Sequence, residues 1–163
     1  MILIKSFFIL EEKQFEELEL LDSKLVNKFG NSFSNEIWNK KNFRYELPKK
    51  FDYSLALFDR EEIIGYVVAS EKNDAIYIHR FAVCKKGYSV KFFYEILKNY
   101  KNKTIFLMVN VTNKRAIEFY KSFNFDIIID TILIKKFIAH DLQIDKNEIV
   151  IGEDYKCYLM KRD

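Results

Sequence analysis

The sequence predicts an α/β (α+β) fold with a mixed central sheet of about six to seven strands and helices on both faces. Three observations support this prediction. Apolar runs typical of strands are interleaved with segments whose apolar residues recur every three or four positions. Three predicted strands follow one another as a meander, after which strands and helices alternate. The 163 residues, 49% of them hydrophobic, suffice for one core, so residues 1–163 are predicted to form a single domain.

The first half of the chain is predicted to contain one strand, two helices and then the meander. Met1–Leu10 has the apolar character of a first strand. Glu11–Phe29 has apolar residues at helical spacing and acidic residues in its first turns, which the helix dipole favours. Ser34–Tyr45 is predicted to be a second helix, ending before Pro48. The strands of the meander, bounded by turns rich in charged residues and Asn, are predicted at Tyr53–Phe58, Ile63–Ser70 and Ala75–Val83.

The second half is predicted to alternate helices with strands. In chain order its elements are the helix Tyr88–Tyr100, the strand Thr104–Val109, the helix Lys114–Ser122 and the strands Ile127–Ile134 and Tyr155–Met160. The residues of the first of these helices that are predicted to face the core are Val90, Phe93, Tyr94 and Leu97.

Composition argues against several functional classes. The net charge is only +3 and the lysines are dispersed, so a nucleic-acid partner is not predicted. No apolar run approaches the roughly 20 residues that cross a bilayer, and no signal-peptide pattern is present, so we predict a cytoplasmic protein without a membrane partner. Cys84 and Cys157 are predicted to be buried structural thiols. The histidines and cysteines lie too far apart for a metal-ligand spacing, so no metal site is predicted.

The most informative segment is Asn110–Phe125, which predicts the end of a strand, a capped helix and a turn into another strand. Asn113 can cap the helix, and Ala116 and Tyr120 share one helical face. This pattern resembles the GNAT acyltransferases, whose second conserved block runs Asn-x-x-Ala-x-x-x-Tyr-x-x-x-Gly-Phe. Asn124 stands where the family prefers Gly, and Asn tolerates the left-handed conformation that ends such a helix. The predicted order of elements also resembles the GNAT fold, so the resemblance covers nearly the whole chain.

The resemblance implies a site for acetyl-coenzyme A (acetyl-CoA). In this family the main chain of a central strand pairs with the pantetheine arm, and the amides of the next loop, Arg/Gln-x-x-Gly-x-Gly/Ala, hold the pyrophosphate at a helix N-terminus. The end of that strand corresponds here to Phe81, Ala82 and Val83. The residues of the loop that are implied to bind the pyrophosphate are Lys86, Gly87, Tyr88, Ser89, Val90 and Lys91. Asn113 is implied to touch the pantetheine or phosphate arm.

The loop departs from the family pattern. Lys86 replaces Arg or Gln, Ser89 replaces the middle Gly, Lys91 replaces the last small residue, and the link from Val83 is about two residues shorter than usual. Ser89 keeps an amide and adds a hydroxyl, and the lysines add positive charge. The missing glycine restricts the backbone, and a bulky Lys91 obstructs close approach. Two interpretations stay open: the loop still binds coenzyme A, or this homologue has lost that binding.

The resemblance also implies direct attack of a primary amine on the acetyl thioester in a ternary complex. By position, Tyr120 is implied to be the acid that protonates the leaving thiolate, although a role in packing the helix on the sheet is equally open. His79 lies four residues before Val83, which predicts that both share a strand face and makes His79 the candidate base. A lone His on a strand is more often packed or hydrogen-bonded. Tyr77 and Glu71 are weaker candidates.

The acceptor, a small-molecule or protein amine, is not identified by the sequence. The resemblance implies that Phe29–Phe51 and the late segment, residues 135–154, line its site. The late segment is too long and too apolar for a simple hairpin connection. It predicts an extended hairpin over the core, the surface of a homodimer or a wall of the acceptor site.

Two functions from different classes remain open. The first is an acetyl-CoA-dependent N-acetyltransferase, predicted from the element order and the Asn113–Phe125 match. The second is a catalytically degenerate GNAT-like module that binds or regulates a partner, predicted from the altered loop and the lack of an obvious carboxylate base.

Overall fold

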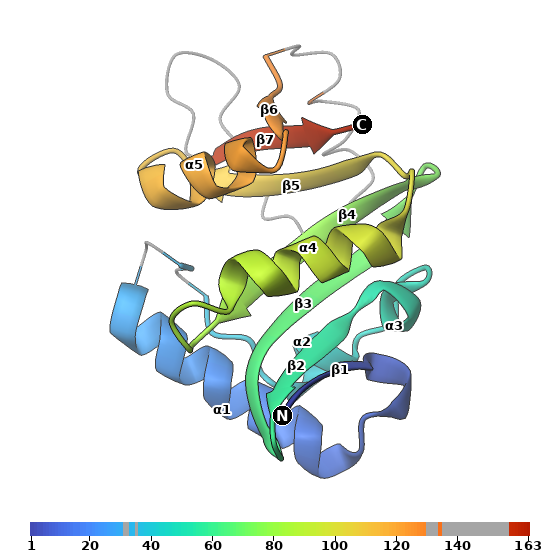
Figure 1. Ribbon diagram of the computed structural model, residues 1–163, viewed down its shortest axis with the longest axis vertical. Helices are drawn as coiled ribbons and strands as arrows, with labels where there is room; N and C mark the ends of the chain where they lie inside the picture. The colour runs from blue at the N-terminus through green and yellow to red at the C-terminus, as the bar shows by residue number, and fades with distance from the viewer. Residues whose placement is uncertain (31–32, 35, 130–133, 135–156) are drawn as a thin grey trace.

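The described residues fold as a seven-stranded mixed sheet with helices on both faces, as predicted (Figure 1). The structure, a computed structural model, describes residues 1–30, 33–34, 36–129, 134 and 157–163. The strands are β1 (Ile2–Ser6), β2 (Leu55–Asp59), β3 (Glu62–Lys72), β4 (Ala75–Val83), β5 (Ile105–Asn110), β6 (Asp126–Ile127) and β7 (Cys157–Arg162). The helices are η1 (a 3-10 turn, Phe7–Ile9), α1 (Glu12–Phe29), α2 (Lys40–Arg44), α3 (Lys50–Tyr53), α4 (Ser89–Tyr100) and α5 (Lys114–Ser122).

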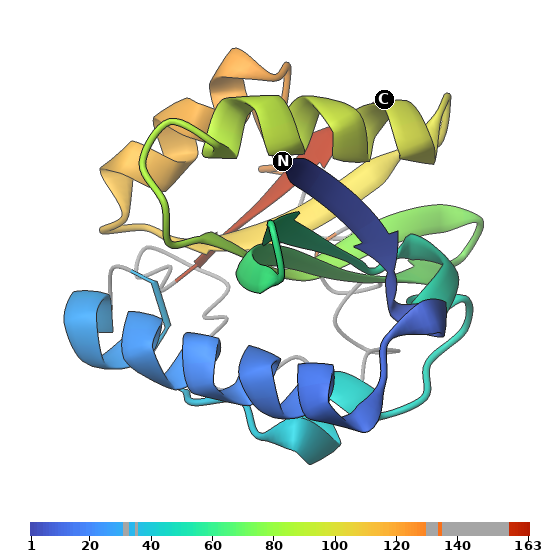
Figure 2. The ribbon, with the colours of Figure 1, turned by 60° about the horizontal axis from the view of Figure 1, so that its bottom comes forward.

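The strand order is β1-β2-β3-β4-β5-β7-β6, and β4 and β5 are the parallel pair in an otherwise antiparallel sheet. Helices α4 and α5 cover one face, and α1 covers the other (Figure 2). The connection from β4 through α4 to β5 is the crossover that two parallel neighbours require.

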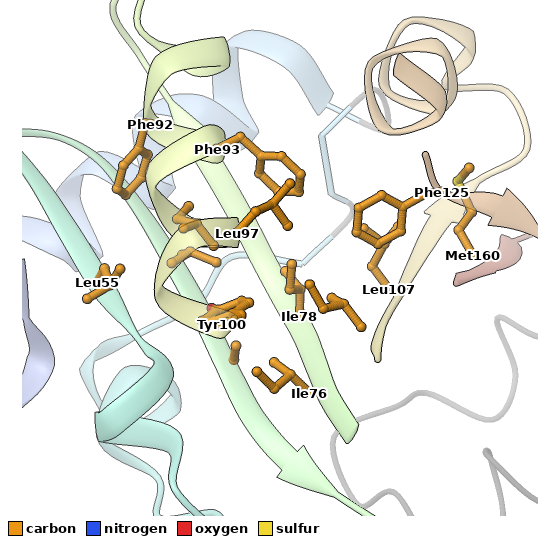
Figure 3. Packing of buried hydrophobic residues seen from close by; sticks show 14 of the residues in the cluster. Leu55, Ile76, Ile78, Phe92, Phe93, Leu97, Tyr100, Leu107, Phe125 and Met160 are labelled. Carbon is orange, nitrogen blue, oxygen red and sulfur yellow. The ribbon is translucent and has the colours of Figure 1, made fainter. Parts of the chain in front are cut away.

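The face under α4 and α5 is closed by a large apolar cluster (Figure 3). Buried side chains of α4 meet aliphatic residues of the sheet, and Phe93 is fully enclosed. The predictions for Phe93 and Leu97 are confirmed, whereas those for Val90 and Tyr94 are wrong, because these side chains are 62% and 58% exposed. The buried stripe of α4 centres on Phe93, Ile96 and Tyr100, which leaves Val90 and Tyr94 on its flank.

The N-terminal third differs from its prediction in three places. The first strand ends at Ser6, whose hydroxyl caps η1. The second helix covers only Lys40–Arg44, because Asn39 caps it and the N–H of Trp38 donates to the carboxylate of Asp22 at 2.7 Å. A short helix at Lys50–Tyr53, which was not predicted, precedes β2.

The two hairpins of the meander turn at charged residues and Asn, as predicted, and neither turn contains glycine. Arg60 takes a φ of +58° between β2 and β3, and Asn73 and Asp74 take +50° and +62° between β3 and β4. Asn and Asp adopt this left-handed region more readily than most residues, which explains why the second turn needs no Gly.

The C-terminal predictions are met in part. The strand predicted at Ile127–Ile134 is limited, among the described residues, to Asp126–Ile127, and β7 extends to Arg162. The predictions for residues 135–154 lie outside the described residues. Within the described ranges, no helix combines the length and the apolar character needed to cross a membrane.

Candidate functional site

The parallel strands β4 and β5 pair only over their first residues. The paired positions are Ile76 with Ile105, Tyr77 with Phe106, and Ile78 with Leu107. Beyond them the described residues of the two strands are not paired, and the strands diverge toward their C-terminal ends (Figure 1). Among the described strands, none pairs with the facing main-chain edges there, which is unusual inside a sheet because backbone N–H and C=O groups are normally paired.

A bulge in β4 sets which side chains face which side of the sheet. Val68 pairs with Arg80 and Ala69 with Ile78, so His79 is an extra residue on β4. His79 therefore shares a face with Tyr77, whose ring centroid lies 4.5 Å from its own. Val83 instead packs with the α4 cluster on the opposite face. The prediction that His79 and Val83 share a face is wrong, because the bulge shifts the alternation by one residue.

The unpaired edge of β4 presents main-chain groups of Phe81 and Val83. Cys84 donates to the carbonyl of Ile64 at 2.9 Å, and antiparallel bonding alternates, so Ala82 also turns its main chain toward β3. The main-chain groups of Phe81 and Val83 then point away from β3, toward the diverging β5. An extended ligand could bind there as an added strand.

β3 packs closely behind this edge at Gly65. A Cβ atom at Gly65 would lie 2.9 Å from the carbonyl oxygen of Ala82 and 3.0 Å from Cγ2 of Val83. A side chain at this position would therefore displace the end of β4.

The loop after β4 turns sharply into the N-terminus of α4. Gly87 has a φ of +91°, which favours glycine, and the N–H of Tyr88 approaches the carbonyl of Lys85 at 3.5 Å. The first full helical bond runs from the N–H of Phe92 to Tyr88 at 2.9 Å. The amides before it, those of Ser89, Val90 and Lys91, have no carbonyl within the helix to bond, and such a helix end attracts anions.

The lysines of this loop have different partners. Lys85 makes an ion pair with Asp59, and this hydrogen bond lowers the pKa of Asp59 and raises the pKa of Lys85. Lys86 and Lys91 are exposed, and no carboxylate among the described residues pairs with either of them. These two cations are therefore available to an anion at the start of α4.

Tyr120 lies in a cluster of aromatic rings on α4 and α5. Its ring centroid is 5.6 Å from that of Phe93, 5.4 Å from Phe119 and 5.8 Å from Phe125. Burial raises the pKa of Tyr120, so the phenol keeps its proton at neutral pH. No described residue makes a hydrogen bond to its hydroxyl group.

The ends of α5 match the predicted motif. The side chain of Asn113 accepts from the N–H of Ala116 at 3.1 Å, which is the predicted cap. Asn124 follows the helix with a φ of +65°, the left-handed conformation expected where the family pattern has Gly.

The side chain of His79 is half-buried on the sheet. Its Nε2 atom is 2.7 Å from the hydroxyl of Ser70. Burial, together with the charges of Lys50 and Lys72, lowers the pKa of His79 to about 3. A base works best with a pKa near the working pH, so His79 is a weak base for an ammonium group. Glu71 is bound to Lys103 at 2.9 Å, and this hydrogen bond lowers its pKa.

The structure brings Phe81, Val83, the loop and the start of α4 together on the unpaired end of β4. It does not bring His79 and Tyr120 onto one face of the sheet, because His79 lies with Tyr77 and Tyr120 lies with the α4 cluster. The prediction of buried thiols is wrong for Cys84, which is exposed at the start of the loop, whereas Cys157 is half-buried. No group of three or more metal-ligating side chains occurs within the described part of the chain.

Sequence reasoning missed one feature beside this site, the buried pair of Asp22 and Arg80. The carboxylate lies on the apolar face of α1 and the guanidinium lies in β4 next to His79. The available signal was an acid among the buried leucines of a helix and an arginine inside an apolar strand, since such charges are rarely buried without a partner.

Comparison with known proteins gives one family. The sequence model of the family described as Acetyltransferase (GNAT) family matches residues 23–125, which is more than half of the chain. The comparison with curated proteins returned no match.

Several solved structures share the fold. Naa50 from Arabidopsis thaliana, in complex with the bisubstrate analogue CoA-Ac-MVNAL, is 17% identical with a TM-score of 0.63 over 99% of this chain and 98% of its own. The PaiA N-acetyltransferase from Thermoplasma acidophilum, in complex with coenzyme A, is 13% identical with a TM-score of 0.66 over 99% and 98%. The ribosomal-protein-S18-alanine N-acetyltransferase from Escherichia coli is 15% identical with a TM-score of 0.62 over 99% and 92%. At sequence identities of 13% to 17%, the similarity to these three structures establishes that this chain shares their fold.

Proposed function

Since the chain belongs to the GNAT acetyltransferase family, we propose that it is an N-acetyltransferase that transfers acetyl from acetyl-CoA to the primary amine of an unidentified acceptor. The acceptor is a small molecule or a protein, and both substrates are bound together. The coenzyme A ligand of the PaiA structure and the bisubstrate analogue of the Naa50 structure support acetyl-CoA as co-substrate.

The observation that carries this proposal is the divergence of β4 and β5 beside the N-terminus of α4. The open main-chain groups of Phe81 and Val83 would bond the pantetheine amides, and Ala82 would keep the strand on β3. The amides of Ser89, Val90 and Lys91 would hold the pyrophosphate after the turn at Gly87 and Tyr88. Their geometry supports this arrangement because it offers unpaired donors to an anion and an unpaired edge to an extended chain.

Side chains would supplement these main-chain contacts. Lys86 and Lys91 are exposed cations at the proposed pyrophosphate site, where they would compensate for the missing Gly and Arg of the family pattern. Asn113 would contact the pantetheine or phosphate arm from the start of α5 while it caps the helix.

In the proposed reaction the neutral amine nitrogen attacks the carbonyl carbon of the thioester. A C–N bond forms, the C–S bond breaks, the amine loses one proton and the sulfur gains one. Tyr120 would donate from its hydroxyl to the leaving sulfur, for which its raised pKa keeps the proton in place. His79, whose ring contacts the hydroxyl of Ser70, stays the candidate base that would accept the proton from the amine.

One observation favours the second function, a catalytically degenerate module. The pKa of His79, lowered to about 3, makes it a poor acceptor of the amine's proton. A GNAT-like protein that binds coenzyme A without efficient transfer would have such a site.

The two functions are separated by measuring coenzyme A release from acetyl-CoA with a panel of amines: peptides with free N-termini, lysine peptides, polyamines and amino sugars. An acetyltransferase releases coenzyme A with at least one amine, and Tyr120→Phe lowers kcat by about 10²-fold or more. Tyr94→Phe, an exposed tyrosine on α4, is the matched control and leaves the rate unchanged. Binding of acetyl-CoA without release in any mixture would favour the second function.

We propose that residues 1–163 act as one domain in the cytoplasm, where a reducing environment suits the exposed thiol of Cys84. A homodimer formed through residues 135–154 remains a prediction.

A further inference from the structure

The carboxylate of Asp22 is the centre of a buried hydrogen-bond cluster between α1 and the sheet. Asp22 and Tyr66 have no exposed surface. Oδ1 of Asp22 accepts from the Tyr66 hydroxyl and from Nε of Arg80 at 2.7 Å. Oδ2 accepts from Nη2 of Arg80 at 3.0 Å and from the N–H of Trp38 at 2.7 Å. Both oxygens are therefore fully used, and the pair with Arg80 is bidentate.

Arg80 also binds the segment that follows α1. Its Nη1 donates to the hydroxyl of Ser34 at 3.0 Å, and its Nη2 donates to the carbonyl of Glu36 at 2.6 Å. The guanidinium carbon lies 4.8 Å from the ring of Phe33 and 5.0 Å from that of Trp38. The described residues of this segment are thus organised around one side chain of β4.

The position of Arg80 in β4 places its bonds to the segment after α1 beside the proposed active site. Arg80 follows the bulge residue His79, within the part of β4 that no longer pairs with β5. The segment after α1 lies on the face of the sheet opposite α4 and α5, beside the end where β4 and β5 diverge (Figures 1 and 2). An amine that reaches the acetyl group from that face would pass this segment.

A buried ion pair is not an efficient way to stabilise a fold, since well-packed apolar residues usually do as well. A guanidinium that donates to a carboxylate, a hydroxyl and a carbonyl fixes three groups in one geometry, which a lysine cannot do. Here the carboxylate belongs to α1, the hydroxyl and the carbonyl belong to the segment between α1 and α2, and the guanidinium belongs to β4.

We propose that Arg80, held by Asp22, is a positioning residue that fixes Ser34 and residues 36–38 as a wall of the acceptor site. This inference rests on the proposed acetyltransferase function. Arg80 makes no contact with the reacting atoms and acts through the hydroxyl of Ser34 and the carbonyl of Glu36, while Asp22, which holds Arg80, also binds the N–H of Trp38.

The informative variant is Arg80→Lys, because it keeps a cation beside the buried carboxylate and so preserves folding. The lysine cannot bond to Asp22, Ser34 and Glu36 together, so the wall loses bonds that hold it to β4. Tyr66→Phe is the matched control: it removes one bond to the same carboxylate and leaves in place the bonds to Ser34, Glu36 and Trp38.

The first readout needs no acceptor. Trp38 is the single tryptophan of the chain and is 7% exposed, so its fluorescence reports on the wall directly. We expect a red-shifted emission and easier quenching by acrylamide in Arg80→Lys, and a wild-type spectrum in Tyr66→Phe. Equal spectra in wild type and Arg80→Lys, or equal shifts in both variants, would overturn the proposed contact.

The second readout is kinetic and uses the best amine of the panel. Arg80→Lys should raise KM for the amine by about tenfold or more, with the Kd for acetyl-CoA changed less than about twofold. Equal losses for amine and acetyl-CoA, or an unchanged KM, would overturn the positioning role. If wild type turns over no amine, the proposed function has failed, whereas the fluorescence result still decides whether Arg80 holds the wall.

Discussion

The face of the sheet under α4 and α5 is packed with phenylalanine and aliphatic side chains, whereas the face under α1 buries the charged pair Asp22 and Arg80. On the first face, the proposed acetyl-CoA contacts come mainly from the main chain, at Phe81, Val83 and the start of α4. On the second, the proposed acceptor wall is held by side chains. A main-chain site tolerates sequence change, and a site held by side chains does not. On the proposed function, this difference is why the altered loop after β4 can bind the pyrophosphate without the family's middle glycine.

The largest effect is expected from breaking the charged pair. Asp22→Ala leaves the guanidinium of Arg80 buried without its carboxylate, which costs ~3–5 kcal/mol of unfolding free energy. Urea unfolding followed by circular dichroism measures this loss. A loss below about 1 kcal/mol would mean that the pair is solvated and that the two faces do not differ as described.

The second effect is a dependence of the free energy of unfolding on pH, which arises from His79 in β4, next to Arg80. Unfolded His has a pKa near 6.5, whereas His79 in the fold has a pKa of about 3. Between these values the unfolded chain binds more protons, so stability falls as the pH falls from about 6.5 toward 3.

When the pH is lowered from about 7 to about 5, the lowered pKa of His79 should reduce the free energy of unfolding by on the order of 2 kcal/mol. The variant His79→Gln should lack this part of the reduction. Unfolding of wild type and variant at both pH values checks the expectation. Parallel losses in the two proteins would mean that His79 is not held neutral by the fold.

The smallest effect is expected on the aromatic face. Phe93→Leu replaces one buried apolar side chain of the α4 cluster by another, and neighbouring phenylalanines can adjust, so the cost should be about 1 kcal/mol. The same unfolding experiment applies. If this variant lost more stability than Asp22→Ala, the comparison between the two faces would be reversed.

The features predicted correctly from the sequence are local. Hydrophobic periodicity predicts α1, α4 and α5, and the spacing from Asn113 to Phe125 predicts both the cap of α5 and the left-handed Asn124. These depend on residues a few positions apart, which interact within one helix or turn.

The features that were missed depend on distant residues. The bulge at His79 arises from pairing with β3 and has no signature within β4 itself. The helix predicted at Ser34–Tyr45 is shortened because Trp38 and Glu36 bond to Asp22 and Arg80. Such contacts form only once α1 is packed on the sheet, so local propensity could not predict them.

The most direct test of the account is calorimetric titration of acetyl-CoA into wild type, Ser89→Ala and Ser89→Asp. Ser89 is the first residue of α4, where an acid favours the helix but repels a pyrophosphate. We predict binding by wild type, a Kd within about threefold for Ser89→Ala, and a Kd at least about tenfold weaker for Ser89→Asp. No binding by wild type at about 1 mM ligand, or unchanged binding by Ser89→Asp, would contradict the proposal that the amides of α4 hold the coenzyme.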